Sequence, residues 1–238
     1  MNMPILELEN VSTFYGEFQA LRGVSLLVDE RKLVGIVGAN GAGKSTLLRT
    51  ITGLTPAQSG RIIFKGVPIE HLPTFEIAKL GIALVPEGRR LFPYMSVLDN
   101  LLLGAFLKPD RQMREKTLQS IFESFPILNR RKSQMAGTLS GGEQQMLAVG
   151  RALMGNPEII MLDEPSLGLS PKMVSQIYRI LDVIKDMGIT VVLVEQNVES
   201  CLRKAEEAYI LENGSIVLEG SGSDLLSKEE VRKAYLGL

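Results

Sequence analysis

The sequence predicts an α/β fold with a mostly parallel sheet, an N-terminal antiparallel β subdomain and an inserted α-helical subdomain. Four apolar runs that indicate strands end at Val37, Val85, Leu162 and Val194, with helical patterns between them. This alternation is typical of a parallel sheet. From about residue 91 to residue 150 the pattern is mostly helical, which predicts an insertion. We expect one domain over residues 1–238, with a core of residues 1–90 and 155–238 and an insert of residues 91–154.

The composition indicates a globular chain. Of its 238 residues, 45% are hydrophobic and 22% are charged, a balance that disordered proteins do not have. The net charge of −1 gives no sign of a surface for nucleic acid or anionic membranes. The one cysteine, Cys201, excludes an internal disulfide, and we expect it to be a small core residue.

The sequence also limits the ways in which the chain could meet a membrane. No run approaches the roughly 18 apolar residues that a membrane helix requires. The N-terminus lacks the basic and apolar regions of a signal peptide. We therefore expect any membrane role to be peripheral and to depend on a partner.

Short β patterns near the N-terminus predict the antiparallel subdomain. They cover residues 5–8, the second half of 20–29, and 60–64. Residues 12–16 predict a turn that presents Tyr15. An aromatic ring there can stack on a nucleotide base, but the residues alone favour a core or edge tyrosine.

The most informative motif follows the apolar run of residues 33–37 and precedes a helical pattern. It fits G-x-x-x-x-G-K-[ST], whose glycines let backbone N–H groups surround a phosphate at the start of a helix. Lys44 supplies a positive charge to the β- and γ-phosphates, and Ser45 offers a hydroxyl to Mg²⁺. The alternative, a plain glycine-rich turn, is disfavoured by the complete spacing. The expected phosphate-binding residues are Gly38, Ala39, Asn40, Gly41, Ala42, Gly43, Lys44, Ser45 and Thr46.

Two acidic residues follow the strand pattern of residues 158–162. Asp163 fits the aspartate on the Mg²⁺ side of P-loop nucleotidases. Glu164 is placed to orient or deprotonate a water molecule. A strand that ends in two acids is a weak signal by itself, because acids commonly follow strands and cap helices, but beside a P-loop it becomes strong.

The predicted insert contains helical patterns at residues 96–106 and 110–125 and ends at Ser140-Gly141-Gly142-Glu143. Ser140 and Glu143 have the spacing of a capping box, so a further helix begins here. Its glycines leave backbone donors bare at the helix N-terminus. This arrangement predicts either a second phosphate contact or a plain cap.

The rest of the chain continues the alternation. Ser170-Pro171 opens a helix that Gly188 closes, and the strand pattern of residues 189–194 leads to Gln196. Asn213-Gly214 predicts a hairpin, and residues 227–238 predict a short terminal helix. Because ligands of parallel sheets bind outside the carboxyl ends of the strands, the strand ends predict one nucleotide pocket.

Together these motifs resemble those of the ATP-binding-cassette (ABC) ATPases over nearly the whole chain. The most specific element is Leu139-Ser140-Gly141-Gly142-Glu143-Gln144, which lies between the P-loop and residues 159–164. The resemblance implies a RecA-like P-loop NTPase core, ATP and Mg²⁺ as cofactors, and two chains that enclose two ATP molecules. Ser140, Gly141, Gly142 and Glu143 of one chain would contact ATP held by the P-loop of the other.

The resemblance also implies individual roles. Tyr15 stacks on adenine, Glu164 is the catalytic base, and residues 166–169 form a loop across the dimer. Gln196 takes the position of a switch residue near the γ-phosphate. Ser45, Glu87 and Asp163 lie on the Mg²⁺ side.

Three positions depart from the usual pattern of this family. Glu87 stands where glutamine is usual, so a carboxylate is added near the phosphates. Gln196 stands where histidine is usual, and its amide can donate a hydrogen bond but cannot titrate. Arg31-Lys32 replaces a common Gly-Glu pair. A mechanism that needs an imidazole is therefore not expected, whereas Glu164 remains the expected base.

Residues 85–90, 164–169 and 194–197 resemble one of the two ATPase subunits of branched-chain amino-acid importers, the LivF type. This implies ATP hydrolysis that drives uptake through two separate membrane permease subunits, with a solute-binding protein involved indirectly. It also implies a second ATPase subunit, identical or homologous, no nucleic acid, and a peripheral place at the cytoplasmic face of the inner membrane. The alternatives are a soluble ABC ATPase module with a regulatory or assembly role, and a nucleotide-binding protein without turnover.

Overall fold

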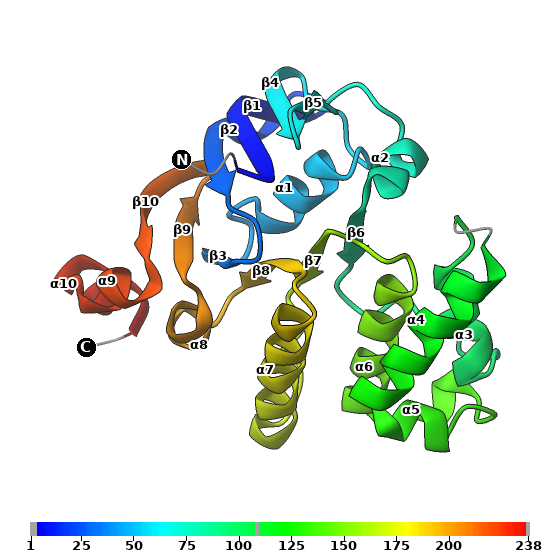
Figure 1. Cartoon of the computed structure of the whole chain (residues 1–238). Helices are drawn as coiled ribbons and strands as arrows, with labels where there is room; N and C mark the ends of the chain where they lie inside the picture. The colour runs from blue at the N-terminus through cyan, green and yellow to red at the C-terminus, as the bar shows by residue number, and fades with distance from the viewer. Residues whose placement is uncertain (1–3, 108–109, 237–238) are drawn as a thin grey trace.

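The computed structural model describes residues 4–107 and 110–236. Its centre is a six-stranded sheet with the strand order β10-β9-β3-β8-β7-β6 (Figure 1). All neighbouring strands are parallel except β9 and β10, so the predicted mostly parallel sheet is confirmed. The strands are β3 (Leu33–Val37), β6 (Ile82–Val85), β7 (Ile159–Asp163), β8 (Thr190–Glu195), β9 (Glu207–Glu212) and β10 (Ser215–Ser221).

A second sheet, with the order β2-β1-β4-β5, is antiparallel and lies above the first in Figure 1. Its strands are β1 (Leu6–Tyr15), β2 (Phe18–Val28), β4 (Ser59–Phe64) and β5 (Val67–Pro68). The antiparallel subdomain is confirmed, but the turn predicted at residues 12–16 lies later, at Gly16 and Glu17. The strand continues to Tyr15 because Val11 and Thr13 alternate as buried residues, and the Thr13 hydroxyl lies 3.0 Å from that of Thr50.

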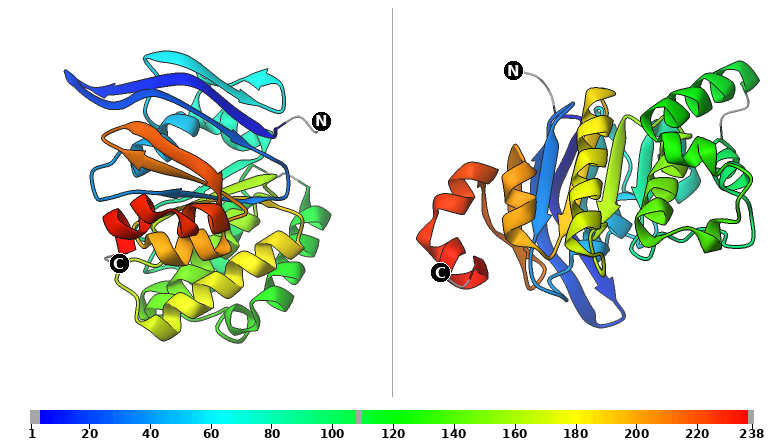
Figure 2. Two further views of the ribbon diagram at one scale, coloured as in Figure 1. Left: turned by 90° about the vertical axis from the view of Figure 1, so that its left-hand side faces the viewer. Right: turned by 90° about the horizontal axis from the view of Figure 1, so that it is seen from below.

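Most helices of the predicted insert form a group beside β6 (Figures 1 and 2). The helices α3 (Val97–Gly104) and α4 (Arg111–Ser124) match the two predicted patterns, and each begins and ends one or two residues inside the predicted range. Ser96 caps α3 by accepting a hydrogen bond from the Asp99 N–H. The group is completed by α5 (Pro126–Arg130) and α6 (Gly141–Leu153), with a 3₁₀ turn at Ala136–Thr138 between them.

Both faces of the central sheet are covered. Successive side chains of a strand point to opposite faces, so each strand contributes to the core on both sides of the sheet. On one face, Val34 and Ile36 of β3 pack with α1 (Lys44–Ile51) and the antiparallel sheet. On the other face, Leu33 and Val37 belong to a cluster that contains residues of α7 (Pro171–Asp186) and α8 (Val198–Lys204). Seen from below, α8, α7 and the helical group lie side by side (Figure 2).

The remaining helices lie at the edges. α2 (Thr74–Leu80) precedes β6, and α9 (Gly222–Ser227) packs on α8. The helix predicted at residues 227–238 is confirmed in part, because α10 (Glu229–Val231) continues directly into a π-helical turn at Arg232–Leu236, while residues 237–238 lie outside the described residues. The hairpin at Asn213-Gly214 is confirmed, with Glu212 opposite Ser215 and φ angles of 48° and 81° at the two central residues.

The strand β3 and the helix α8 approach each other closely at Gly35. A Cβ atom there would lie 2.8 Å from the sulfur of Cys201 and 3.0 Å from the Cβ of Ala205. Cys201 is fully buried, as predicted for a small core residue. The absence of a side chain at Gly35 therefore lets α8 lie directly on the strand that leads into the P-loop.

We expect Gly35→Ala to lower the free energy of unfolding by about 1–3 kcal/mol, the usual cost of overpacking a core. Chemical denaturation followed by circular dichroism measures this loss. Cys201→Ala removes the nearest atom, so the double variant should lose less stability than the sum of the two single variants. Additive losses would contradict the proposed contact.

Candidate functional site

The P-loop joins the carboxyl end of β3 to the start of α1. Gly41 and Gly43 have φ angles of 81° and 107°, in the left-handed region that favours glycine. Gly43 is the N-cap of α1, and no side chain of the described residues caps this helix. The first N–H groups of α1 are therefore free of side-chain partners at the positive end of the helix, which suits an anion such as phosphate.

Lys44 lies inside this loop with only 4% of its surface exposed. Its Nζ donates to the carbonyl oxygens of Gly38 at 2.9 Å and Ala39 at 3.0 Å. The same Nζ lies 3.0 Å from the carboxylate Oε1 of Glu164, whose side chain is 9% exposed. The structure thus brings the P-loop lysine and Glu164 into direct contact, as one pocket requires.

Ser45 and Asp163 form the second contact between the P-loop and β7. The Ser45 hydroxyl donates to Oδ1 of Asp163 at 3.0 Å. Burial raises the pKa of Asp163, and the nearby carboxylates of Glu164 and Glu87 add to this effect. The hydrogen bond from Ser45 opposes it in part. Asp163 is therefore a partly buried carboxyl group whose pKa the charges of Glu164 and Glu87 also affect, and a bound cation would offset this negative charge.

Glu164 itself has an unusual backbone. Its φ angle is 45°, which residues with a Cβ rarely adopt. Its N–H donates to the carbonyl oxygen of Val194 on β8 at 3.0 Å. Gln196 follows β8 and is exposed. Glu164 and Gln196, the two residues expected near the γ-phosphate, thus follow the adjacent ends of β7 and β8.

Glu87 follows β6 after Pro86 and is exposed. A cavity of about 670 Å³ is lined by Glu87, Asp163 and Arg49, among others. The carboxyl ends of β3, β8, β7 and β6 lie next to one another in the sheet. The four strand ends singled out in the sequence therefore meet at one edge.

Tyr15 lies at the end of β1 beside α1. Its hydroxyl is 3.3 Å from that of Thr55, and 45% of its surface is exposed. It is an edge residue rather than a core residue. Its exposed ring is free to receive a ligand, but its stacking on adenine stays a prediction.

The signature residues lie elsewhere in the same chain. Ser140 caps α6, and its N–H and hydroxyl donate to Oε2 of Glu143 at 2.9 Å and 2.8 Å. The predicted capping box is confirmed. Figure 1 shows α6 among the helices of the insert, apart from α1. The structure therefore does not bring Ser140, Gly141, Gly142 and Glu143 to the P-loop of their own chain.

Two residues near the site received no role from the sequence. Arg89, with a φ angle of 65°, donates through Nη1 to Oε1 of Gln144 at 2.9 Å and so joins the Glu87 segment to α6. Glu195 is 2% exposed and accepts a hydrogen bond from the Ser166 N–H at 3.2 Å. The only sign in the sequence that Glu195 has a special role is that a charged residue ends an apolar strand.

Comparisons with known proteins agree with this geometry. The family model described as ABC transporter matches residues 21–167. The chain is 48% identical to the high-affinity branched-chain amino acid transport ATP-binding protein BraG of Pseudomonas aeruginosa, over 98% of this chain and 100% of that protein. It is 37% identical to the probable branched-chain amino acid transport ATP-binding protein LivF of Archaeoglobus fulgidus, over 94% and 95% of the two chains.

Solved structures give the same result. A crystal structure of the ADP conformation of an ABC transporter cassette has a TM-score of 0.89, with 33% identity and 100% coverage of both chains. A dimeric, post-hydrolysis cassette bound to ADP and Pi has a TM-score of 0.79, with 29% identity and 91% and 98% coverage. Within residues 4–107 and 110–236, no helix has the length and apolarity to cross a membrane. The chain belongs to the ABC transporter family, as an ATP-binding cassette ATPase.

Proposed function

We propose that the chain is the ATP-hydrolysing subunit of an importer for branched-chain amino acids and acts through separate membrane permease subunits. The proposal that the chain hydrolyses ATP is supported chiefly by the contact of Lys44 with Glu164, beside Ser45 and Asp163. The 48% identity to BraG supports the solute class. No feature of the described residues favours a regulatory or assembly module instead.

ATP is held by residues 38–46. The backbone N–H groups at the start of α1 bind the phosphates, and Lys44 turns its charge to the β- and γ-phosphates. Its three N–H donors now reach Gly38, Ala39 and Glu164, so it exchanges at least one of these contacts for phosphate oxygen. Tyr15 stacks on the adenine ring through its exposed side.

The residues present fit Mg²⁺. Among the described residues no group of three or more His, Cys, Asp or Glu side chains forms a complete metal site. Mg²⁺ commonly binds through one or two carboxylates, water and substrate phosphates, and Ser45 and Asp163 offer hard oxygen atoms 3.0 Å apart. Bound Mg²⁺ would neutralise charge on the phosphates, with Ser45 and Asp163 holding it and Glu87 adding a third oxygen ligand.

Glu164 acts as the general base. Its carboxylate lies beside Lys44, where the γ-phosphate is expected, and can accept a proton from the attacking water. Gln196 orients the γ-phosphate through its amide N–H donors and carries no proton in the reaction. Asp163 stays on the Ser45 side, so the two neighbouring acids have different tasks.

Two ATPase subunits, identical or homologous, enclose the nucleotide. Ser140, Gly141, Gly142 and Glu143 lie apart from the P-loop of their own chain (Figure 1), so they can meet ATP only on a second subunit. The dimeric relative supports this arrangement. The backbone donors in the first turn of α6 that the capping box leaves free face the γ-phosphate of the partner subunit's ATP.

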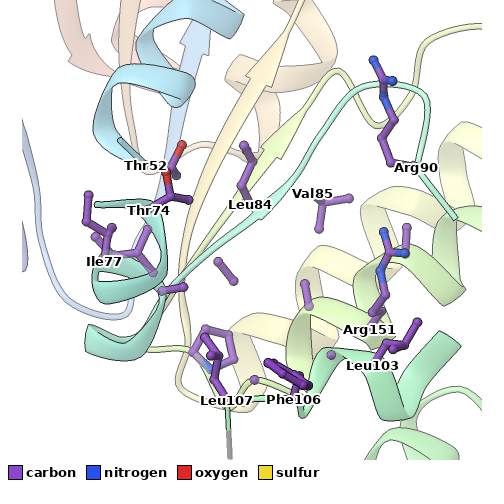
Figure 3. Close-up of a pocket in the computed structure, with 18 of the residues that line it drawn as sticks. Thr52, Thr74, Ile77, Leu84, Val85, Arg90, Leu103, Phe106, Leu107 and Arg151 are labelled. Atoms are coloured by element: carbon purple, nitrogen blue, oxygen red, sulfur yellow. The ribbon is translucent and has the colours of Figure 1, made fainter. Parts of the chain in front are cut away.

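The permease subunits dock in a groove of about 630 Å³ between α2, β6, α3 and α6 (Figure 3). Its wall is mostly apolar, and Figure 3 shows Leu103, Phe106 and Arg151 facing Ile77 and Thr74. Phe106 is 83% exposed. A helix with one apolar face and an acidic residue near Arg151 suits this groove. In this proposal the chain is a peripheral subunit at the cytoplasmic face of the inner membrane.

Phe106→Glu tests the docking surface. We expect it to weaken association with the permease subunits at least tenfold, because an aromatic anchor in an interface is commonly worth about 2 kcal/mol. ATP binding by the purified chain should not change. Phe18→Glu alters another exposed aromatic residue, on the antiparallel sheet, and serves as the control. Co-purification from membranes measures both, and equal behaviour of the two variants would contradict the assignment.

The transport function is tested by reconstitution. The chain, its second ATPase subunit and the permease subunits are placed in vesicles that contain ATP. Uptake of radiolabelled leucine, valine and isoleucine that stops without ATP supports the proposal. Hydrolysis without uptake of any of these amino acids, in the presence of the solute-binding protein, would overturn the solute class.

A further inference from the structure

Glu195 is a buried carboxyl group that the proposed mechanism does not use. It ends β8, directly before Gln196, and is 2% exposed. Its Oε1 accepts a hydrogen bond from the Ser166 N–H at 3.2 Å. Carboxyl groups are rarely buried unless they have partners, so this contact calls for an explanation.

The contact lies beside the strained backbone of Glu164. A left-handed conformation at a residue with a Cβ costs about 1–3 kcal/mol and persists only where neighbouring contacts hold it. Two contacts to consecutive residues of β8 do so here. The Glu164 N–H donates to the Val194 carbonyl at 3.0 Å, and two residues later the Ser166 N–H donates to Glu195.

We propose that Glu195 is a positioning residue for ATP hydrolysis, because its carboxyl oxygen holds the Ser166 N–H and thereby fixes the turn that aims the Glu164 carboxylate. This proposal rests on the proposed role of Glu164 as general base. Glu195 touches neither ATP nor the attacking water. It acts only through the backbone of residues 164–166.

The carboxyl group of Glu195 lies in buried surroundings. Burial raises its pKa, and the charge of Glu164 adds to this effect, while the hydrogen bonds from Ser166 oppose it. The Tyr178 hydroxyl on α7 is also buried and has no hydrogen-bond partner among the described residues. Burial and the charge of Glu195 raise the pKa of Tyr178, so its hydroxyl keeps its proton. Glu195 is therefore shielded from water and lies near enough to Tyr178 of α7 for its charge to affect the tyrosine.

The same side chain also joins the two parts of the site. The turn that carries Glu164 follows β7, whereas Gln196 follows Glu195 on β8. A movement of either strand end would change the distance between Glu164 and Gln196. The bond from Ser166 to Glu195 keeps these two side chains at a constant separation.

Glu195→Met tests the proposal in the full-length chain, since methionine has a similar length but no acceptor oxygen at this position. We expect kcat for ATP hydrolysis to fall at least tenfold, while KM for ATP stays within about twofold. Hydrogen exchange of the Ser166 amide, followed by NMR, should become at least tenfold faster. Glu195→Gln keeps an acceptor oxygen and should retain kcat and amide protection within about threefold.

A matched control comes from Glu206. Its carboxylate accepts a hydrogen bond of 3.2 Å from the Leu33 N–H, at the end of β3 that lies away from the P-loop. Glu206→Met should leave kcat unchanged. Unchanged kcat in Glu195→Met, an unchanged Ser166 amide, or a glutamine variant as inactive as the methionine variant would each overturn the proposal. If the methionine variant does not fold, Glu195→Leu is measured in the same way. Glu164→Gln, measured in parallel, tests the role of Glu164 as general base separately. The exchange rate of the Ser166 amide does not depend on hydrolysis, so it tests the role of Glu195 even if Glu164 is not the base.

Discussion

Glu164→Gln is expected to lower kcat for ATP hydrolysis by about 10²–10⁴-fold, the usual contribution of a general base. Glutamine has the same shape as glutamate but cannot accept a proton from water. ATP should still bind, because Lys44 keeps its two contacts to the carbonyl oxygens of Gly38 and Ala39. KM for ATP should therefore change by no more than a few-fold.

Steady-state phosphate release measures this loss in the chain alone and in the assembled transporter. Glu219→Gln, an exposed glutamate on β10, is a matched control and should leave hydrolysis unchanged. Since ATP binds but is not cleaved, the Glu164 variant should also accumulate as an ATP-bound dimer in size-exclusion chromatography. Hydrolysis at the wild-type rate would show that another group accepts the proton.

Lys44→Ala is expected to weaken ATP binding by about 10- to 150-fold, since hydrogen bonds to charged groups are worth about 1.5–3 kcal/mol. The same change leaves the Glu164 carboxylate, 9% exposed, without its ion-pair partner at 3.0 Å. The variant should therefore lose both the phosphate contact and the cation that holds Glu164 in its present position.

Titration with a fluorescent ATP analogue measures this change. Lys32→Ala is the control, because Lys32 pairs with Asp29 at 2.7 Å and with Glu207 at 2.5 Å beyond the amino end of β3. Its removal should not alter nucleotide affinity. Similar losses in the two variants would indicate a general effect of charge rather than a contact within the P-loop.

The parts of the site that the sequence predicted are encoded locally. The P-loop has a fixed spacing, and Asp163 follows a buried strand whose place in a parallel sheet is visible from the alternation of elements. The capping box at Ser140 needs only two residues three positions apart. Each of these features survives in the structure because it depends on neighbours in the chain.

The parts that were missed depend on contacts between distant segments. Thr13 reads as a turn residue, yet it is buried against Thr50, 37 positions away. The bond from Arg89 to Gln144 spans 55 positions, and that from Ser166 to Glu195 spans 29. A hydrophobic pattern read over a short stretch of sequence cannot show which distant residues pair. Such pairs form only when the strands and the helical group pack together.

The burial of Cys201 beneath Gly35 has a practical consequence. Because the chain has one cysteine and its sulfur is covered by β3, maleimide and similar reagents find no accessible native thiol. Burial also raises the pKa of this thiol, which keeps the nucleophilic thiolate scarce. Fluorophores or spin labels can thus be attached to cysteines introduced at chosen surface positions without first removing the native one.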